Sequence, residues 1–408
     1  MSRVAFHGLR EEQRPFVNMP GGQAAVGDEP PVTIPVCRPR LPTTGQLLPY
    51  LQRIDASRIY SNYGPLALEL ESRLAEHFGL PPGGVACASS GTAALFGAII
   101  ATAGRASDSR PWALVPALTF TATAAAAEQA GYRPYLVDVD PATWMLDPDC
   151  ISAHPMLDRV GLVVPVAPFG RPVPVEPWRG FRARTGVPVV IDGAASFQNI
   201  AEAPTELLGD LPVCISFHAT KSFATGEGGA VATSNAALAE RVMQVLNFGF
   251  SGGRDSACAS TNGKMSEYHA AIGLAELDSW TEKRAAFQAV AECYRRTLAG
   301  TSLISRFIGA PDIGLNYALF ACRAPDDLDA IRESLRLWGV DFRHWYGTGL
   351  SSQSYYADCP RDRLDVTERL ASELLGIPMA PDLSPAAVAC VVAALGEGAV
   401  TGCEREIA

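Results

Sequence analysis

The chain has 408 residues, of which 48% are hydrophobic and 19% charged, enough to bury a large core and to form more than one folded unit. Its 33 basic and 43 acidic side chains leave a formal net charge of −10, which excludes the positive surface that nucleic-acid binding requires. The apolar runs, such as 161–168, are far shorter than the roughly 20 residues that span a bilayer, so no membrane segment is expected.

The N-terminal residues and the cysteines bear on the location of the protein and on metal binding. The first residues lack a basic start followed by an apolar segment, so no secretory signal is visible and we expect a cytoplasmic protein. Ten scattered cysteines include no Cys-x-x-Cys pair, which argues against a zinc cluster and a disulfide framework, and no metal site is expected. Residues 1–31 are rich in Gly, Pro and charge without a sustained period, which predicts a flexible N-terminal extension.

From residue 65 the sequence alternates between helical and strand patterns. Residues Leu66, Leu70, Leu74 and Phe78 recur at four-residue spacing, which predicts a helix. Short β-branched runs predict strands, and helical stretches at 121–131 and 236–246 separate some of them. The predicted strands are 112–115, 134–137, 162–166, 187–191, 213–217 and 229–233. Such alternation favours an α/β fold with a mostly parallel sheet covered by helices.

The last third of the chain has a different pattern. A long helical pattern runs from Ser266 toward Leu298 and could carry the chain into a second, smaller α+β unit. In that unit we expect a strand at 315–322, a helix at 325–338 that opens with two aspartates, and a last helix at 385–395.

A first candidate for chemistry is the segment 88–95, where small residues and a glycine lead into an apolar helix. The free N–H groups and positive dipole end of such a helix form a seat for phosphate or carboxylate. An ordinary helix cap explains the same residues equally well.

A second candidate is Asp192, which ends the apolar run 187–191. Ligands bind at the carboxyl ends of strands in open α/β sheets, and a carboxylate buried there needs a partner. A helix-capping aspartate is the structural alternative.

A third candidate is Lys221, which lies between a predicted strand and the glycine-rich turn 226–229. A desolvated lysine has the lowered pKa that Schiff-base formation with a carbonyl requires. An exposed loop lysine is the alternative for this segment alone. Together, however, a phosphate seat, an acid for a pyridinium nitrogen and a Schiff-base lysine are what pyridoxal phosphate requires.

At this point the chain, over residues 32–396, resembles the DegT/DnrJ/EryC1/StrS family of pyridoxal-phosphate-dependent aminotransferases. The resemblance rests on ordered motifs: 61–65 (SNYGP), 89–95 (SSGTAAL), 115–123 (VPALTFTAT), 135–141 (YLVDVDP), 192–195 (DGAA), 216–221 (SFHATK), 226–229 (GEGG) and 262–271 (NGKMSEYHAA). So many matches in order make chance an unsatisfactory explanation.

The resemblance implies a role for each matching residue. Lys221 would hold the cofactor and later shuttle a proton, and Asp192 would keep the pyridine nitrogen protonated. Phe120 would stack on the cofactor ring, although core packing is the alternative for this side chain. Gly91, Thr92 and Ser216 match phosphate contacts. The segment with Asn262 and Lys264 matches a loop that reaches the cofactor of the neighbouring subunit, which implies a homodimer with shared sites.

Two residues depart from the family pattern, and two others are candidates for substrate binding. Ala195 stands where the family usually has Gln or His near the ring hydroxyl, and Ser196 or Asn199 could substitute. Lys264 offers a point charge where the family has an arginine fork. Arg343, in the segment 341–346, could bind a donor carboxylate or a nucleotide phosphate, or be a surface arginine; Tyr63 lies in the other loop expected to set substrate specificity.

By resemblance we expect the aspartate aminotransferase fold, known as fold type I. A large domain over 56–280 would hold a mostly parallel seven-stranded sheet, and residues 32–55 and 281–408 would form the small domain. The expected reaction moves an amino group from an amino-acid donor, L-glutamate in the first instance, to the ketone of a nucleotide-linked deoxysugar or a cyclitol, in secondary-metabolite or glycan biosynthesis. A dehydratase or synthase of the same family and a non-catalytic regulatory homologue are the alternatives, and the intact Lys221 disfavours both.

Overall fold

The computed structural model of the chain describes residues 34–323, 325–347 and 349–406. The expected N-terminal extension, 1–31, lies outside the described residues. Within the described ranges, no helix has the length and apolar character needed to cross a membrane.

The strands of the large domain form two ladders. The first has the order β1-β7-β6-β5, in which β7 is antiparallel to both neighbours and β5 is parallel to β6. The second has the order β3-β2-β4 and is parallel throughout. Isolated parallel bridges, Val163–Val189 and Val166–Asp192, lie where β4 faces the segment that ends in β5. The strands are β1 (Val85–Ala88), β2 (Trp112–Pro116), β3 (Arg133–Val137), β4 (Val160–Val163), β5 (Ile191–Asp192), β6 (Val213–Ser216) and β7 (Gly229–Ala232).

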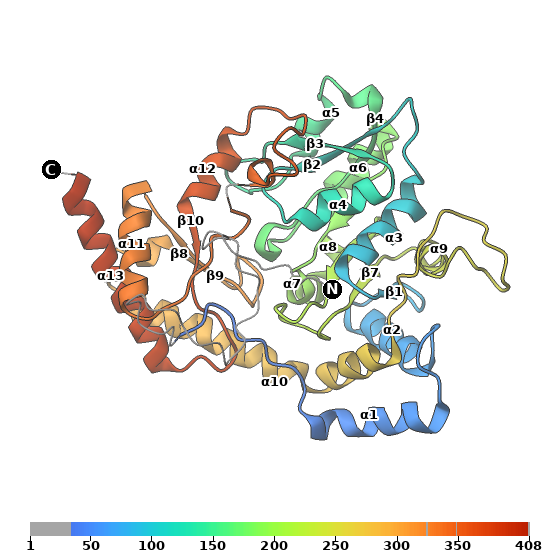
Figure 1. Cartoon of the computed structure of the whole chain (residues 1–408), viewed down its shortest axis with the longest axis horizontal. Coiled ribbons are helices and arrows are strands. Elements are labelled where there is room, and N and C mark those ends of the chain that lie inside the picture. The colour runs from blue at the N-terminus through green and yellow to red at the C-terminus, as the bar shows by residue number, and fades with distance from the viewer. Residues whose placement is uncertain (1–33, 324, 348, 407–408) are drawn as a thin grey trace, which may run out of the picture.

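The helices of this domain cover both faces of the ladders (Figure 1), as the expected α/β fold requires. Alternate strand residues enter different cores, because successive side chains of a strand point to opposite faces. Leu114, Ile191 and Ile215 join the core with α2 (Pro65–His77), α6 (Val175–Thr185) and α7 (Phe197–Glu202). Val115, Val190 and Cys214 join the core with α3 (Gly91–Ala103), α4 (Thr121–Gln129) and α9 (Ala236–Leu246). The short helices α5 (Pro148–Ser152) and α8 (Pro204–Leu207) complete the domain.

Local sequence signals explain where several helices begin. α2 starts with Pro65, which is preorganised for a first helical position, and its leucines at four-residue spacing are buried as predicted. The side chain of Ser90 caps α3 by accepting a hydrogen bond from the Ala93 N–H at 3.1 Å. Asn235 caps α9 in the same way, and the predicted bounds 236–246 are confirmed.

The small domain is built on a three-stranded antiparallel sheet in the order β10-β9-β8. Its strands are β8 (Phe307–Gly309), β9 (Ala318–Ala321) and β10 (Leu374–Gly376), and its helices are α11 (Pro325–Leu337), α12 (Asp365–Glu373) and α13 (Pro385–Glu406). The predicted strand 315–322 is thus shorter, and the predicted last helix is longer than 385–395. Bridges Ile34–Val340 and Cys37–Met379 attach the N-terminal segment to this domain.

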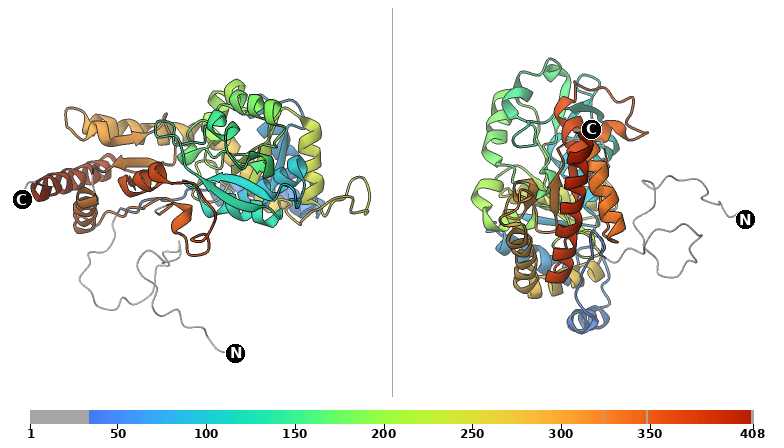
Figure 2. Two further views of the ribbon diagram at one scale, coloured as in Figure 1. Left: turned by 90° about the horizontal axis from the view of Figure 1, so that it is seen from above. Right: turned by 90° about the vertical axis from the view of Figure 1, so that its left-hand side faces the viewer.

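The long helix α10 (Glu267–Leu298) connects the two domains. It packs on α2 and α1 (Thr44–Ser57) near one end and on α13 near the other, and Figure 1 shows it passing below both domains. Figure 2 shows the small domain beside the large one in the view from above. The predicted domain boundary at residue 280 falls inside α10.

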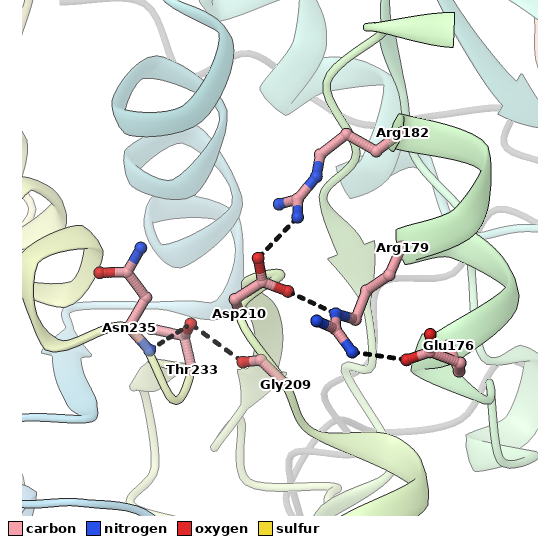
Figure 3. Close-up of polar contacts among 7 residues, drawn as sticks. All are labelled: Glu176, Arg179, Arg182, Gly209, Asp210, Thr233 and Asn235. Atoms are coloured by element: carbon pink, nitrogen blue, oxygen red, sulfur yellow. Dashed lines mark hydrogen bonds and ion pairs between the residues drawn. The ribbon is translucent and has the colours of Figure 1, made fainter. Parts of the chain in front are cut away.

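A charged network fixes the turn that leads into β6. The Asp210 carboxylate accepts hydrogen bonds from Arg179 Nε at 2.8 Å and Arg182 Nη2 at 2.6 Å, both on α6 (Figure 3). Beside it, the Thr233 hydroxyl donates to the Gly209 carbonyl at 3.2 Å. Partial burial opposes ionisation of Asp210, but the two guanidiniums hold its pKa below the usual range. This network lies where β6 begins, away from the strand ends that carry the candidate residues.

Glu71 is a buried carboxylate on α2 with no described ion pair. Its Oε1 accepts a hydrogen bond from the Cys87 N–H of β1 at 2.7 Å. Burial raises the pKa of Glu71 from 4.5 to about 7, and the hydrogen bond only partly opposes this shift. Because the folded chain keeps this proton to higher pH than the unfolded chain, the contribution of Glu71 to stability falls as pH rises from about 4.5 through 7.

We therefore predict that Glu71→Gln, which keeps an acceptor oxygen for Cys87, makes the protein less sensitive to this pH change. Between pH 5 and pH 8 the wild-type free energy of unfolding should fall by roughly 2–3 kcal/mol more than that of the variant. Urea unfolding of both proteins at the two pH values measures the difference. Equal pH dependence in the two proteins would show that Glu71 is not the responsible group.

Candidate active site

Asp192 ends β5 inside the large domain and is only 5% exposed. It shares the α4 side of the sheet with Val190, because Ile191 between them enters the opposite core. There the Thr123 hydroxyl of α4 donates to Asp192 Oδ2 at 2.7 Å, and the Ala194 N–H donates to Oδ1 at 3.1 Å. Burial raises the pKa of Asp192, while these two donors and the charge of Lys221 oppose the rise. Asp192 is therefore no helix cap but a buried acid.

Lys221 lies in a tight turn between β6 and β7. The Lys221 N–H donates to the His218 carbonyl at 2.8 Å, and the Ala219 N–H donates to the carbonyl of Gly226, whose φ of +85° favours glycine. The side-chain amine donates to the Tyr317 hydroxyl at 3.4 Å. Since the Lys221 charge acts on Asp192, the structure brings together the two residues that the sequence singled out.

Gly91, Thr92 and Ser216 meet where α3 begins and β6 ends. A side chain at Gly91 would place its Cβ 2.8 Å from the Ser216 Cβ, so only glycine lets the helix approach this closely. The first N–H groups of a helix have no partner within the helix and carry its positive dipole end. The Ser216 hydroxyl stands beside them, so the three residues form a seat suited to a phosphate group.

Phe120 stands directly before α4 and is 59% exposed. This exposure rules out core packing, which was the alternative for this side chain. An open aromatic ring one helical turn from Thr123, the partner of Asp192, is available to stack on a planar ligand.

Asn262 and Lys264 lie beside β1. Lys264 forms an isolated bridge with Ala88, and the Gly263 carbonyl accepts a hydrogen bond from the Ser89 N–H at 2.7 Å. The Lys264 amine donates to Asn262 Oδ1 at 2.7 Å, and partial burial lowers its pKa. In the described part of the chain, neither side chain makes a hydrogen bond or ion pair with Lys221 or Asp192.

The two candidate substrate residues are engaged elsewhere in the single chain. The Tyr63 hydroxyl donates to the Met243 carbonyl at 2.8 Å, and burial raises its pKa. Arg343 Nη1 donates to Asp341 Oδ1 at 2.7 Å, while its charge acts on Cys37. Cys37 and Lys221 line the same small cavity, so Arg343 lies near the Lys221 cavity, and Tyr63 does not line it.

The substitutes considered for Ala195 do not reach Asp192. Asn199 Nδ2 donates to the Gly170 carbonyl at 2.9 Å. Ser196 Oγ is buried without a partner in the described residues, and it lines a small cavity with Ile191 on the opposite side of the sheet. Position 195 therefore contributes no polar group, and neither neighbour replaces one.

Sequence reasoning missed two residues of the site. Thr123 was part of a quoted motif, and a buried threonine in the first turn of α4 was the available signal. Tyr317 comes from the small domain, and nothing in its local sequence indicates that its hydroxyl meets Lys221.

The residues that meet fit pyridoxal phosphate. Asp192 is a buried carboxylate whose remaining charge a pyridinium nitrogen would offset, and the close approach at Gly91 forms the phosphate seat. The sequence contains three lysines, at 221, 264 and 283. Lys283 is held in a buried ion pair with Glu276 and Lys264 binds Asn262, which leaves Lys221 as the lysine beside the acid.

Comparison with known proteins agrees with this arrangement. The model of the DegT/DnrJ/EryC1/StrS aminotransferase family matches residues 44–396. A protein of Mycobacterium tuberculosis is 33% identical over 90% of this chain and 91% of its own length. The UDP-2-acetamido-2-deoxy-3-oxo-D-glucuronate aminotransferase of Pseudomonas aeruginosa is 29% identical over 81% of this chain and 90% of its own.

The solved structures show the same fold. The crystal structure of DesI, determined in the presence of its TDP-sugar product, is 29% identical and has a TM-score of 0.77. The match covers 94% of this chain and 97% of DesI. The chain therefore belongs to the DegT/DnrJ/EryC1/StrS aminotransferase family and is a pyridoxal-phosphate-dependent aminotransferase.

Proposed function

We propose that this aminotransferase moves an amino group from L-glutamate to a ketone on a nucleotide-linked deoxysugar or a cyclitol. The observation that carries the proposal is that the Lys221 turn and the buried Asp192 lie at the same end of the sheet, where the charge of Lys221 acts on the Asp192 carboxylate. The named relatives support the acceptor class, since one acts on a UDP-linked oxo sugar and DesI was solved with a TDP-sugar product.

The chain supplies the binding and proton-handling groups. When bound, pyridoxal phosphate provides a reactive carbonyl and an electron-withdrawing ring. Gly91, Thr92 and Ser216 bind the phosphate, and Phe120 orients the ring by stacking. Asp192 holds a proton at the ring nitrogen, and the Thr123 hydroxyl keeps its carboxylate in place.

Lys221 has two tasks in this proposal. Its amine would hold the cofactor at its carbonyl, with loss of water, and once free would carry a proton to and from the substrate carbon. Arg343 binds an anionic group of the donor or the nucleotide, whereas Tyr63, whose hydroxyl donates to the Met243 carbonyl, has no role at Lys221 of the same chain. The same proton abstraction could lead to elimination, which is the chemistry of the dehydratase alternative. A regulatory protein would not need both Lys221 and Asp192 at this end of the sheet.

We also propose that the two ladders of the large domain act as one mostly parallel seven-stranded sheet, since parallel bridges join β4 to the segment that ends in β5. The large domain would comprise residues 56–280 and the small domain residues 32–55 and 281–408, with α10 connecting the two. This division places Lys221 on the large domain and Tyr317 on the small one.

The partner in this proposal is a second copy of the chain. Large apolar side chains are exposed near α1, α2 and the start of α10, among them Ile59, Tyr60, Leu68 and Tyr268. The rings of Tyr60 and Tyr268 stack at 6.3 Å, so these two exposed residues lie together. In a homodimer these residues would be buried, and Asn262 and Lys264 would reach the partner's cofactor.

The proposed function predicts a covalent link between Lys221 and the cofactor, and a reaction with L-glutamate as donor. Purified protein should show a visible absorbance band that L-glutamate bleaches, and borohydride reduction followed by peptide mass spectrometry should find the cofactor on Lys221. Lys221→Ala should lose the band and lower the transamination rate by about 10³-fold or more, because the nucleophile and proton carrier are removed. Lys264→Ala, which removes another of the three lysines, should retain the link. A band that glutamate leaves unchanged would refute glutamate as donor.

The second prediction concerns the shared site. Lys221→Ala chains are mixed with chains that lack the side chains of both Asn262 and Lys264, under conditions in which subunits exchange. If each site combines these residues from two chains, about half the dimers are mixed and each has one intact site, so about a quarter of wild-type activity should return. A mixture no more active than its separate components would show that the sites are not shared.

A further inference from the structure

Tyr317 is a rigidly held tyrosine of the small domain. It lies just before β9 and is 8% exposed. The rings of Phe169 and Trp345 pack on it at 5.7 Å, each nearly perpendicular to the tyrosine ring. Because both rings pack on the Tyr317 ring, the direction of its hydroxyl group is fixed.

The Tyr317 hydroxyl meets the amine of Lys221. The Nζ–Oη distance is 3.4 Å, and Nζ lies 5.9 Å from the ring centroid. The preceding residue makes a parallel contact, since Asn316 Nδ2 donates to the Thr220 carbonyl at 3.1 Å. Two consecutive residues of the small domain therefore bind two consecutive residues of the lysine turn, one at the backbone and one at the amine.

Several other polar groups surround the Lys221 amine, but no other described side chain hydrogen-bonds to it. The charge of Lys221 acts on Asp192 of β5, and Tyr346 packs against Phe169 beside Tyr317. Ala195, at the position where a polar residue was expected, contributes none. The remaining charged groups that line the same cavity are Arg38 and Arg40 of the N-terminal segment and Lys283 of α10. Of these, Lys283 is ion-paired with Glu276, and Arg38 and Arg40 form ion pairs of 3.6 Å with Asp382 and Glu282.

We propose that Tyr317 is a positioning residue for Lys221. Its hydroxyl accepts a hydrogen bond from the protonated nitrogen and donates one to the uncharged nitrogen, so it holds the amine in one orientation in both states. This role makes and breaks no covalent bond, and no proton passes between the Lys221 nitrogen and the Tyr317 hydroxyl. A hydrogen bond from a charged donor is stronger than one between neutral groups, so loss of the hydroxyl weakens the protonated state more than the uncharged one. The inference rests on the proposed role of Lys221 as the residue that attaches the cofactor.

The test is Tyr317→Phe, which removes the hydroxyl and keeps the packed ring. In cofactor-loaded protein without substrate, the visible absorbance changes with pH as the nitrogen of Lys221 gains its proton. We expect the pH midpoint to fall by roughly half to one unit in the variant, the effect of losing one hydrogen bond from a charged donor. Tyr356→Phe is the matched control, because Tyr356 is also buried but its hydroxyl donates to Glu128 in another part of the core. Its midpoint should equal that of the wild type.

An unchanged or higher midpoint in Tyr317→Phe, or an equal shift in the control, would overturn the proposal. The measurement needs neither an amino donor nor a ketone, so a wrong substrate assignment would leave it unaffected. In the cofactor-free protein, the pH dependence of Lys221 amidination, followed by mass spectrometry, gives a second measurement. Three lysines in the sequence make that measurement simple, and the same downward shift is expected. An unaltered amidination profile would likewise contradict the role of Tyr317.

Discussion

The structure depends on one costly arrangement, the burial of the Asp192 carboxylate where β5 ends. A carboxylate removed from water must be neutralised or paired, and burial raises the pKa of Asp192 accordingly. The chain provides two hydrogen-bond donors, Thr123 and the Ala194 N–H, together with the opposing charge of Lys221. This leaves a site whose electrostatics favour a further cation, and the protonated ring nitrogen of the cofactor is the cation that this enzyme family binds.

The elements around this acid are arranged to complete the site. Parallel pairing of β5 with β6 brings Asp192 and the Lys221 turn to one end of the sheet. The missing side chain at Gly91 lets α3 start against Ser216, which puts the phosphate seat at the same end. α4 begins there as well, so that Phe120 faces outward while Thr123 faces the acid. The small domain then reaches over with Asn316 and Tyr317. The site thus joins three helix or strand ends of one domain to a segment of the other.

Local sequence patterns predicted those parts of the molecule that local physics determines. The capped helix at 236–246, the buried leucine face of α2 and the acid after an apolar run could all be read from spacing and residue type. The strand β1 was not predicted, and of the run 187–191 only Ile191 lies in β5, because pairing depends on neighbours distant in sequence. Tyr317 and the positions of Tyr63 and Arg343 depend on tertiary packing for the same reason. Motif resemblance named the residues proposed to bind the cofactor, whereas the contact between Tyr317 and Lys221 needed the structure.

The central claim is that Asp192 holds a proton on the ring nitrogen of the cofactor. Nitrogen-15 NMR of the protein loaded with pyridoxal phosphate labelled at that nitrogen tests it directly. We predict the chemical shift of a protonated nitrogen in the wild type across neutral pH, and of an unprotonated nitrogen in Asp192→Asn. An unprotonated ring nitrogen in the wild type, or the same shift in both proteins, would contradict the account.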